Sequence, residues 1–147
     1  MKIIIAPTSH AMPNDKINPK NWPYWNELIR KLKDKGHYLY QIGLEGELLL
    51  GCHEDWIDQS FDELKKLLDM CDTFISVDSF FPHFAHYHGR TGTVIFTQSD
   101  PKIFGYKDNN NLLKDRKYLR KGQFWLWTQA EYNEDAFISV DSVLNLF

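Results

Sequence analysis

Short apolar, β-rich runs alternate with amphipathic helical patterns along most of this chain, and few folds accommodate that order. Strands are expected at residues 2–6, 38–42, 56–57, 74–77 and 93–96. Strands that alternate with helices usually pair in parallel, because each crossover returns the chain to the same end of the sheet. The sequence therefore predicts an α/β fold with a three-layer, Rossmann-like, mainly parallel sheet.

Helical periodicity is clearest in two segments. Residues 22–35 have one apolar face, and residues 60–70 begin with a capping box in which Ser60 precedes Glu63. Shorter helices are expected at 48–51, 82–88 and 139–146, and a last strand at 124–127. The polar stretch 107–121 predicts a solvated loop or a surface helix. The apolar faces of the two main helices consist of Trp22, Trp25, Leu28, Ile29 and Leu32 in the first, and of Phe61, Leu64, Leu67 and Leu68 in the second.

Length and composition restrict the class of protein. The 147 residues contain no repeat, linker or composition break, so a single domain over 1–147 is expected. The net charge of -3 offers no basic field for nucleic acid. No apolar run approaches the roughly 20 residues of a membrane span. The two cysteines form no CxxC pattern, which favours a reduced, cytoplasmic compartment over a disulfide framework.

A polar turn between a strand and a helix is the first candidate site. Asp78 and Ser79 follow the strand at 74–77, and Pro82 and His83 open the next helix. Ligands of open α/β sheets bind at this carboxyl edge, and the helix N-terminus there favours phosphate. The alternative is that Asp78 and Ser79 only cap the helix and that His83 only packs.

Other strand ends add polar groups to the same predicted edge. Thr8 and Ser9 follow the first strand, and the loop over residues 11–21 carries Lys16 and Lys20. Glu47 follows the second strand. Because the carboxyl ends of parallel strands share one edge, these side chains are expected to converge.

In this order, the motifs resemble those of the nucleotide-sugar-binding C-terminal domain of family 9 glycosyltransferases, the ADP-heptose:lipopolysaccharide heptosyltransferases. The resemblance runs nearly end to end. Its motifs are Ile5-Ala6-Pro7-Thr8-Ser9, Lys20-Asn21-Trp22-Pro23 with Trp25, Gly43 with Glu47, Ser60-Phe61-Asp62-Glu63-Leu64, Val77-Asp78-Ser79 with His83-Phe84-Ala85, Ser99-Asp100-Pro101, and Phe137-Ile138-Ser139-Val140-Asp141-Ser142-Val143 at the closing helix.

The resemblance implies half of a GT-B glycosyltransferase and a nucleoside diphosphate sugar as donor, with no metal and no further cofactor. Thr8 and Ser9 would offer hydroxyls to the diphosphate, which Lys20 would neutralise. Glu47 would bind ribose hydroxyls and Gln59 the base. The phosphate end would be lined by Asp78, Ser79 and His83. No catalytic residue is assigned.

The chain departs from the family pattern at one residue, in the length of one loop and in overall length. Phe80 stands where the family has a glycine that lets phosphate approach the backbone. The loop before Lys20 is longer, so Lys16 competes for the phosphate role. The family has a second, acceptor-binding domain that carries the catalytic carboxylate. We therefore expect a complete transferase to need a partner chain or a homo-oligomer.

Two other functions fit the sequence less directly. A stand-alone domain of this kind would bind a nucleotide without catalysis. A metal-dependent hydrolase would use His83, His86 and His88, but no HExxH motif or carboxylate pair accompanies these histidines.

Overall fold

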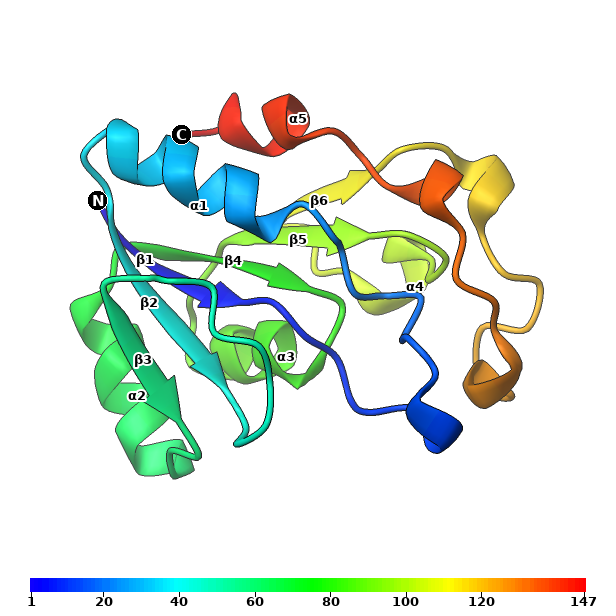
Figure 1. Cartoon of the computed structure of the whole chain (residues 1–147), viewed down its shortest axis with the longest axis horizontal. Helices are drawn as coiled ribbons and strands as arrows, with labels where there is room; N and C mark the ends of the chain where they lie inside the picture. The colour runs from blue at the N-terminus through cyan, green and yellow to red at the C-terminus, as the bar shows by residue number, and fades with distance from the viewer.

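The computed structural model describes residues 1–147, which contain one six-stranded sheet in the order β3-β2-β1-β4-β5-β6 (Figure 1). Every neighbouring pair of strands is parallel. The strands are β1 (Lys2–Ala6), β2 (Tyr38–Gly43), β3 (Glu54–Ile57), β4 (Thr73–Val77), β5 (Thr93–Phe96) and β6 (Asn110–Leu113). The α-helices are α1 (Trp25–Asp34), α2 (Phe61–Met70), α3 (Phe80–Tyr87), α4 (Pro101–Phe104) and α5 (Val140–Leu144).

Helices cover both faces of the sheet, which confirms the predicted three-layer arrangement. Figure 1 shows α1 and α5 on one side and α2 and α3 on the other. Successive residues of β1 point to opposite faces, so Ile3 and Ile5 enter the core beneath α1 while Ile4 enters the core beneath α2. A central strand buried on both faces needs a continuous apolar run, and residues 3–6 supply it.

The strand order reverses direction between β1 and β4. The chain moves outward from β1 to β2 and β3, then returns to place β4 on the other side of β1. The helices that follow the two neighbouring strands lie on opposite faces, which leaves a crevice at their carboxyl ends. Thr8 and Ser9 follow one of these strands and Asp78 follows the other.

The helix predicted at residues 48–51 is absent, and the side chain of Gln41 explains why. Gln41 is fully buried on β2. Its Nε2 donates to the Leu48 carbonyl at 2.9 Å, and its Oε1 accepts from the Leu50 N–H at 2.8 Å. These backbone groups are therefore used by a distant side chain rather than by a helical turn.

The strand predicted at 124–127 is also wrong. Leu126 has a φ of 62°, a left-handed conformation that a strand does not contain. The carbonyls of Trp125 and Leu126 both accept from the Arg120 guanidinium at 2.7 Å, and a short 3-10 turn follows over Trp127–Gln129. The sixth strand instead lies at Asn110–Leu113, inside the stretch that the sequence predicts to be a loop or surface helix.

The two main helices follow the predicted pattern with one exception. The hydroxyl of Ser60 accepts from the Glu63 N–H at 3.2 Å, so the expected cap of α2 is confirmed. All five apolar residues predicted for the first helix are buried, although α1 itself begins only at Trp25. Phe61 is the exception, because 68% of it is exposed rather than packed in the core.

Both cysteines are free, and burial raises the pKa of Cys52 to about 12 and that of Cys71 to about 11. At neutral pH these thiols are protonated and therefore poor nucleophiles. None of the helices combines the length and the apolar character needed to cross a bilayer.

An ion pair at the start of α4 makes a prediction for acid stability. The Arg116 guanidinium donates to both Asp100 oxygens at 2.9 and 2.8 Å, and this contact lowers the pKa of Asp100. A depressed carboxyl pKa stabilises the fold above the unfolded-state pKa, and that stabilisation is lost as pH falls through the native pKa. Asp100→Asn should therefore lower the thermal midpoint by a few degrees at neutral pH.

The difference between Asp100→Asn and the wild-type protein should close in acid, as followed by circular dichroism melts across pH. Asp34→Asn is the matched control, because its ion pair with Arg30 is largely exposed. If the thermal midpoint of Asp100→Asn stayed equally far below that of the wild type in strong acid, the stabilising role of the ion pair between Asp100 and Arg116 would be contradicted.

Candidate functional site

A cavity of about 710 Å³ opens at the carboxyl edge of the sheet beside the β1–β4 switch point. Its lining comes from the ends of β1, β2, β3 and β4 and from the first residues of α2 and α3. All eight residues that the sequence places in the candidate site line this one cavity: Thr8, Ser9, Lys20, Glu47, Gln59, Asp78, Ser79 and His83.

The carboxylate of Glu47 is fixed by contacts from two strand ends. Thr8 Oγ1 donates to Glu47 Oε2 at 2.7 Å. Gly46 has a φ of +88° in the turn that brings the Glu47 N–H to the Leu44 carbonyl at 3.2 Å. Gly43 leaves room for the carboxylate, since a Cβ at that position would collide with it. One oxygen of Glu47 is therefore committed to Thr8, and Oε1 is left as an acceptor.

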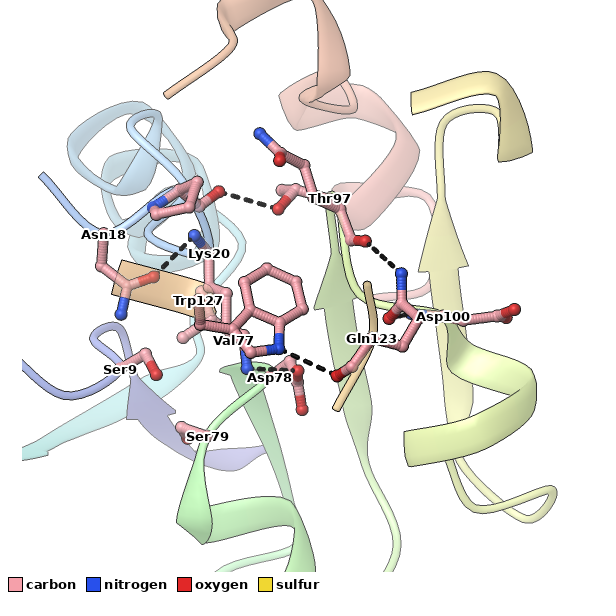
Figure 2. A network of polar contacts seen from close by, with 12 residues as sticks. Ser9, Asn18, Lys20, Val77, Asp78, Ser79, Thr97, Asp100, Gln123 and Trp127 are labelled. Atoms are coloured by element: carbon pink, nitrogen blue, oxygen red, sulfur yellow. Dashed lines mark hydrogen bonds and ion pairs between the residues drawn. The ribbon is translucent and has the colours of Figure 1, made fainter. Parts of the chain in front are cut away.

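The loop that carries Lys20 is held at several points (Figure 2). Asn18 is buried; its Oδ1 accepts from the Lys20 N–H and its Nδ2 donates to the His10 carbonyl, both at 2.9 Å. The buried Thr97 hydroxyl donates to the Pro19 carbonyl at 2.8 Å. Because these contacts fix the backbone next to Lys20, the Cα position and the direction of its side chain at the cavity wall are defined.

Lys20 and Asp78, which both line the cavity, form the ion pair that Figure 2 shows. Lys20 Nζ lies 3.0 Å from Asp78 Oδ2, and the side chains are only 15% and 8% exposed. Asp78 Oδ2 is buried and has no hydrogen-bond partner, so its contact with Lys20 is an ion pair only. The charge of Asp78 is thus compensated by Lys20, whereas its hydrogen-bonding capacity is not used.

Trp127 covers this ion pair from a part of the chain far away in the sequence. Lys20 Nζ lies 4.6 Å from the Trp127 ring centroid, and the Arg120 guanidinium carbon lies 5.1 Å from the same ring. Trp127 Nε1 donates to the Gln123 carbonyl at 2.9 Å, which fixes the ring in place (Figure 2). Both cations are close enough to the ring for cation–π attraction. Nothing in the sequence indicates this contact.

The start of α3 offers fewer donors for phosphate than the sequence suggests. The Ser79 hydroxyl accepts from the Phe81 N–H at 3.4 Å, and Pro82 has no N–H to offer. Ser79 therefore caps α3, as the alternative expects, and it also lines the cavity. The capping alternative is wrong for Asp78, which faces Lys20 instead.

His83 and its neighbours on α3 are engaged with aromatic rings. His83 Nδ1 lies 2.7 Å from the Tyr106 hydroxyl, and the His86 ring stacks on Tyr106 with centroids 3.7 Å apart. His88 packs on Phe84 at 4.6 Å. No three His, Cys, Asp or Glu side chains are grouped to hold a metal ion. Of the three histidines, only His83 lines the cavity.

Lys16, the competing lysine, lies outside the cavity. Its ammonium is 3.3 Å from Glu131 Oε1 and 3.4 Å from the Thr128 carbonyl. Lys20 is the only lysine or arginine in the cavity lining. Of the two lysines that this loop carries, only Lys20 therefore lines the cavity.

The rest of the lining is mostly apolar and was largely missed by sequence reasoning. The sequence singles out Phe80 only as a replacement for a family glycine, and Phe61 only as part of the apolar face of its helix. His10 is a further polar residue that was not selected. The apolar part of the lining includes Leu44, Trp56, Phe61, Leu64, Phe80 and Phe104.

The strand order and the cavity at its switch point define a Rossmann-like α/β fold with a carboxyl-edge site. No family model and no curated protein matches the sequence. Among solved structures, the chain is similar to the iron-containing dodecameric glycosyltransferase TibC of enterotoxigenic E. coli, with a TM-score of 0.63 and 19% identity over 78% of this chain and 32% of TibC.

A second solved protein shares the fold. The heptosyltransferase WaaC of E. coli, with ADP-2-deoxy-2-fluoro heptose, matches with a TM-score of 0.59 and 18% identity over 76% of this chain and 36% of WaaC. TibC in complex with ADP-D-β-D-heptose matches with a TM-score of 0.62 and 20% identity. The chain thus spans about a third of the length of these heptosyltransferases and has the fold of that part.

Proposed function

We propose that the chain binds a nucleoside diphosphate sugar, as the donor-binding part of a heptosyltransferase-like glycosyltransferase. One observation carries the proposal. The eight residues assigned to donor binding by resemblance come from five separate segments and line one cavity, which contains a single lysine. The fold shared with TibC and WaaC, each solved with an ADP-sugar, supports the same choice of ligand.

Lys20 would bind the diphosphate. An ammonium group has three donors, and only one direction is occupied by Asp78. The remaining donors are free to meet phosphate oxygens, with the hydroxyls of Ser9 and Ser79 nearby in the lining. Because Asp78 and Glu47 add negative charge to the cavity, an anionic ligand depends strongly on this one cation.

The same groups would act on the leaving group during transfer. When the bond between the anomeric carbon and the diphosphate oxygen breaks, its electron pair and negative charge go to the diphosphate. A fixed ammonium stabilises that charge as it develops. The acceptor and its base would come from a partner chain or a second copy of this chain; TibC, which shares the fold, is a dodecamer. A cytoplasmic location is part of the proposal.

One assay separates transferase from simple binding. The purified chain is incubated with ADP-, UDP- and GDP-sugars, with and without candidate acceptors, and release of nucleoside diphosphate is measured beside calorimetric binding. Tight binding without release in any oligomeric state would favour a non-catalytic nucleotide-binding protein. Absence of binding to every nucleotide would refute both functions.

Glu47 makes a prediction about the ribose. Its Oε1 is free to accept from ribose hydroxyls while Thr8 holds Oε2. Glu47→Ala should weaken ADP binding about tenfold, since hydrogen bonds to a charged acceptor contribute roughly 1.5 kcal/mol. Binding of 2′,3′-dideoxy-ADP, measured by calorimetry, should change little. A comparable loss for both ligands would place Glu47 away from the ribose.

A further inference from the structure

Two exposed phenylalanines stand at the apolar part of the cavity. Phe61 is the first residue of α2 and Phe80 the first residue of α3, and both line the cavity. They are 68% and 52% exposed, although large aromatic side chains are usually covered. Their ring centroids are 6.3 Å apart with planes at 40°, so they are tilted rather than stacked on each other.

Both rings are supported from behind. Phe84 stacks against Phe61 with centroids 5.7 Å apart and planes at 28°. Phe80 meets the fully buried Phe81 edge-on at 6.1 Å, and Phe81 meets Phe74 of the core in the same way at 5.4 Å. These contacts hold the two exposed rings in place before any ligand arrives, which reduces the entropy lost on binding.

We propose that Phe61 and Phe80 form an aromatic platform on which the planar base of the ligand stacks. This inference rests on the proposed function. The cavity has a charged part, around Lys20 and Asp78, and an apolar part that contains the two rings. A nucleotide has the same two-part chemistry, an anionic diphosphate joined to a flat ring. A face of the base contacts the ring of Phe61 or of Phe80. Burial of the apolar surfaces of the base and of the ring drives the contact.

The position of the platform agrees with that of the neighbouring amide. Gln59 precedes Phe61 by two residues and lines the same cavity. Its Nε2 donates one N–H to the Ile57 carbonyl at 2.9 Å, so Oε1 and the second N–H remain for the edge of a base. With so few polar groups available for the edge of the base, its faces supply most of the affinity. Phe80 thus offers the ligand an aromatic face, which a glycine at this position could not provide.

The experiment compares a ligand that has a base with one that lacks it. Isothermal titration of the full chain with ADP and with inorganic pyrophosphate is performed for wild type, Phe61→Ala, Phe80→Ala and Phe61→Leu. Tyr87→Ala is the matched control, because Tyr87 is 84% exposed on α3 and lies outside the cavity. Circular dichroism melts establish that each variant folds, as expected for exposed positions.

Each alanine variant should weaken ADP binding about tenfold, the cost typical of removing one stacking ring. The alanine variants should keep the wild-type affinity for pyrophosphate, and Tyr87→Ala should keep the wild-type affinity for ADP. Phe61→Leu should lose part of the affinity for ADP. ADP affinities within twofold of wild type in both alanine variants would overturn the platform and leave the proposed function standing. The platform would also be overturned if the alanine variants changed only the self-association of the chain, as measured by sedimentation. A wild-type chain that binds neither probe would overturn both proposals.

Discussion

Lys20→Ala should weaken binding of ADP by about 10- to 100-fold and leave binding of adenosine nearly unchanged. Lys20 is the only lysine or arginine of the cavity lining, and its ammonium is held between Asp78 and the Trp127 ring. A charge-assisted contact to phosphate contributes roughly 1.5–3 kcal/mol, which corresponds to that range of affinity. Isothermal titration with the two ligands measures the effect directly.

The same substitution should also lower stability, because it leaves the buried Asp78 carboxylate without a counter-charge. Removing one partner of a buried ion pair costs about 3 kcal/mol, and Asp78 is only 5% exposed. The double variant Lys20→Ala/Asp78→Asn removes both charges and should recover most of the stability in urea unfolding. It should not recover ADP binding. Equal losses for ADP and adenosine, or ADP binding restored in the double variant, would show that Lys20 does not contact the diphosphate.

Trp22→Ala should reduce the free energy of unfolding by about 4 kcal/mol, the largest stability effect we expect from one core substitution. Trp22 is 1% exposed and packs edge-on against Trp25 with ring centroids 5.2 Å apart. Its Nε1 donates to the Ile138 carbonyl at 2.9 Å, which joins the segment before α1 to the segment before α5. The alanine variant loses both the packing and this connection.

Two controls separate the contributions of Trp22, with urea unfolding as the measurement. Trp22→Phe keeps most of the packing and loses the indole hydrogen bond, so we expect a loss of roughly 1–2 kcal/mol. Trp125→Ala should be almost neutral, because Trp125 is 65% exposed. If Trp22→Ala and Trp125→Ala were equally stable, the role given to Trp22 would be wrong.

The strands that were predicted correctly are those whose burial on both faces requires an apolar run. β1, β2, β4 and β5 are of this kind, and their mainly apolar runs are recognisable without knowledge of their neighbours. β6 was missed because an edge strand tolerates polar residues such as Asn110 and Asn111. Its conformation depends on pairing with β5, which local composition does not reveal.

The two segments that were predicted wrongly are controlled by distant side chains. Gln41 binds the backbone of residues 48–50, and Arg120 binds the carbonyls of Trp125 and Leu126. Hydrogen bonds of this kind override local propensity because a buried polar group must find a partner. Periodicity carries no information about them.

In the candidate site, too, some features could be predicted from the sequence and others depend on contacts between distant segments. Convergence of Thr8, Glu47 and Asp78 follows from strand order alone, since parallel strands end at one edge. The pairing of Lys20 with Asp78 and the ring of Trp127 above it depend on loops whose paths cannot be read from the sequence. Phe61 was assigned to the apolar face of its helix, and helical spacing does not distinguish a core face from a cavity wall.

The central position of β1 has a consequence for synthesis and folding. Ile3 pairs with Leu39 on one side and with Thr73 on the other, so the middle of the sheet is closed only by residues made much later. Such distant pairings slow folding. A nascent chain that ends before Val77 therefore exposes one edge of β1. The crevice at the end of β1 then lacks the side that β4 and the residues after it provide. Chaperone dependence during translation should be greatest in that interval, when unpaired strand edges are prone to aggregation.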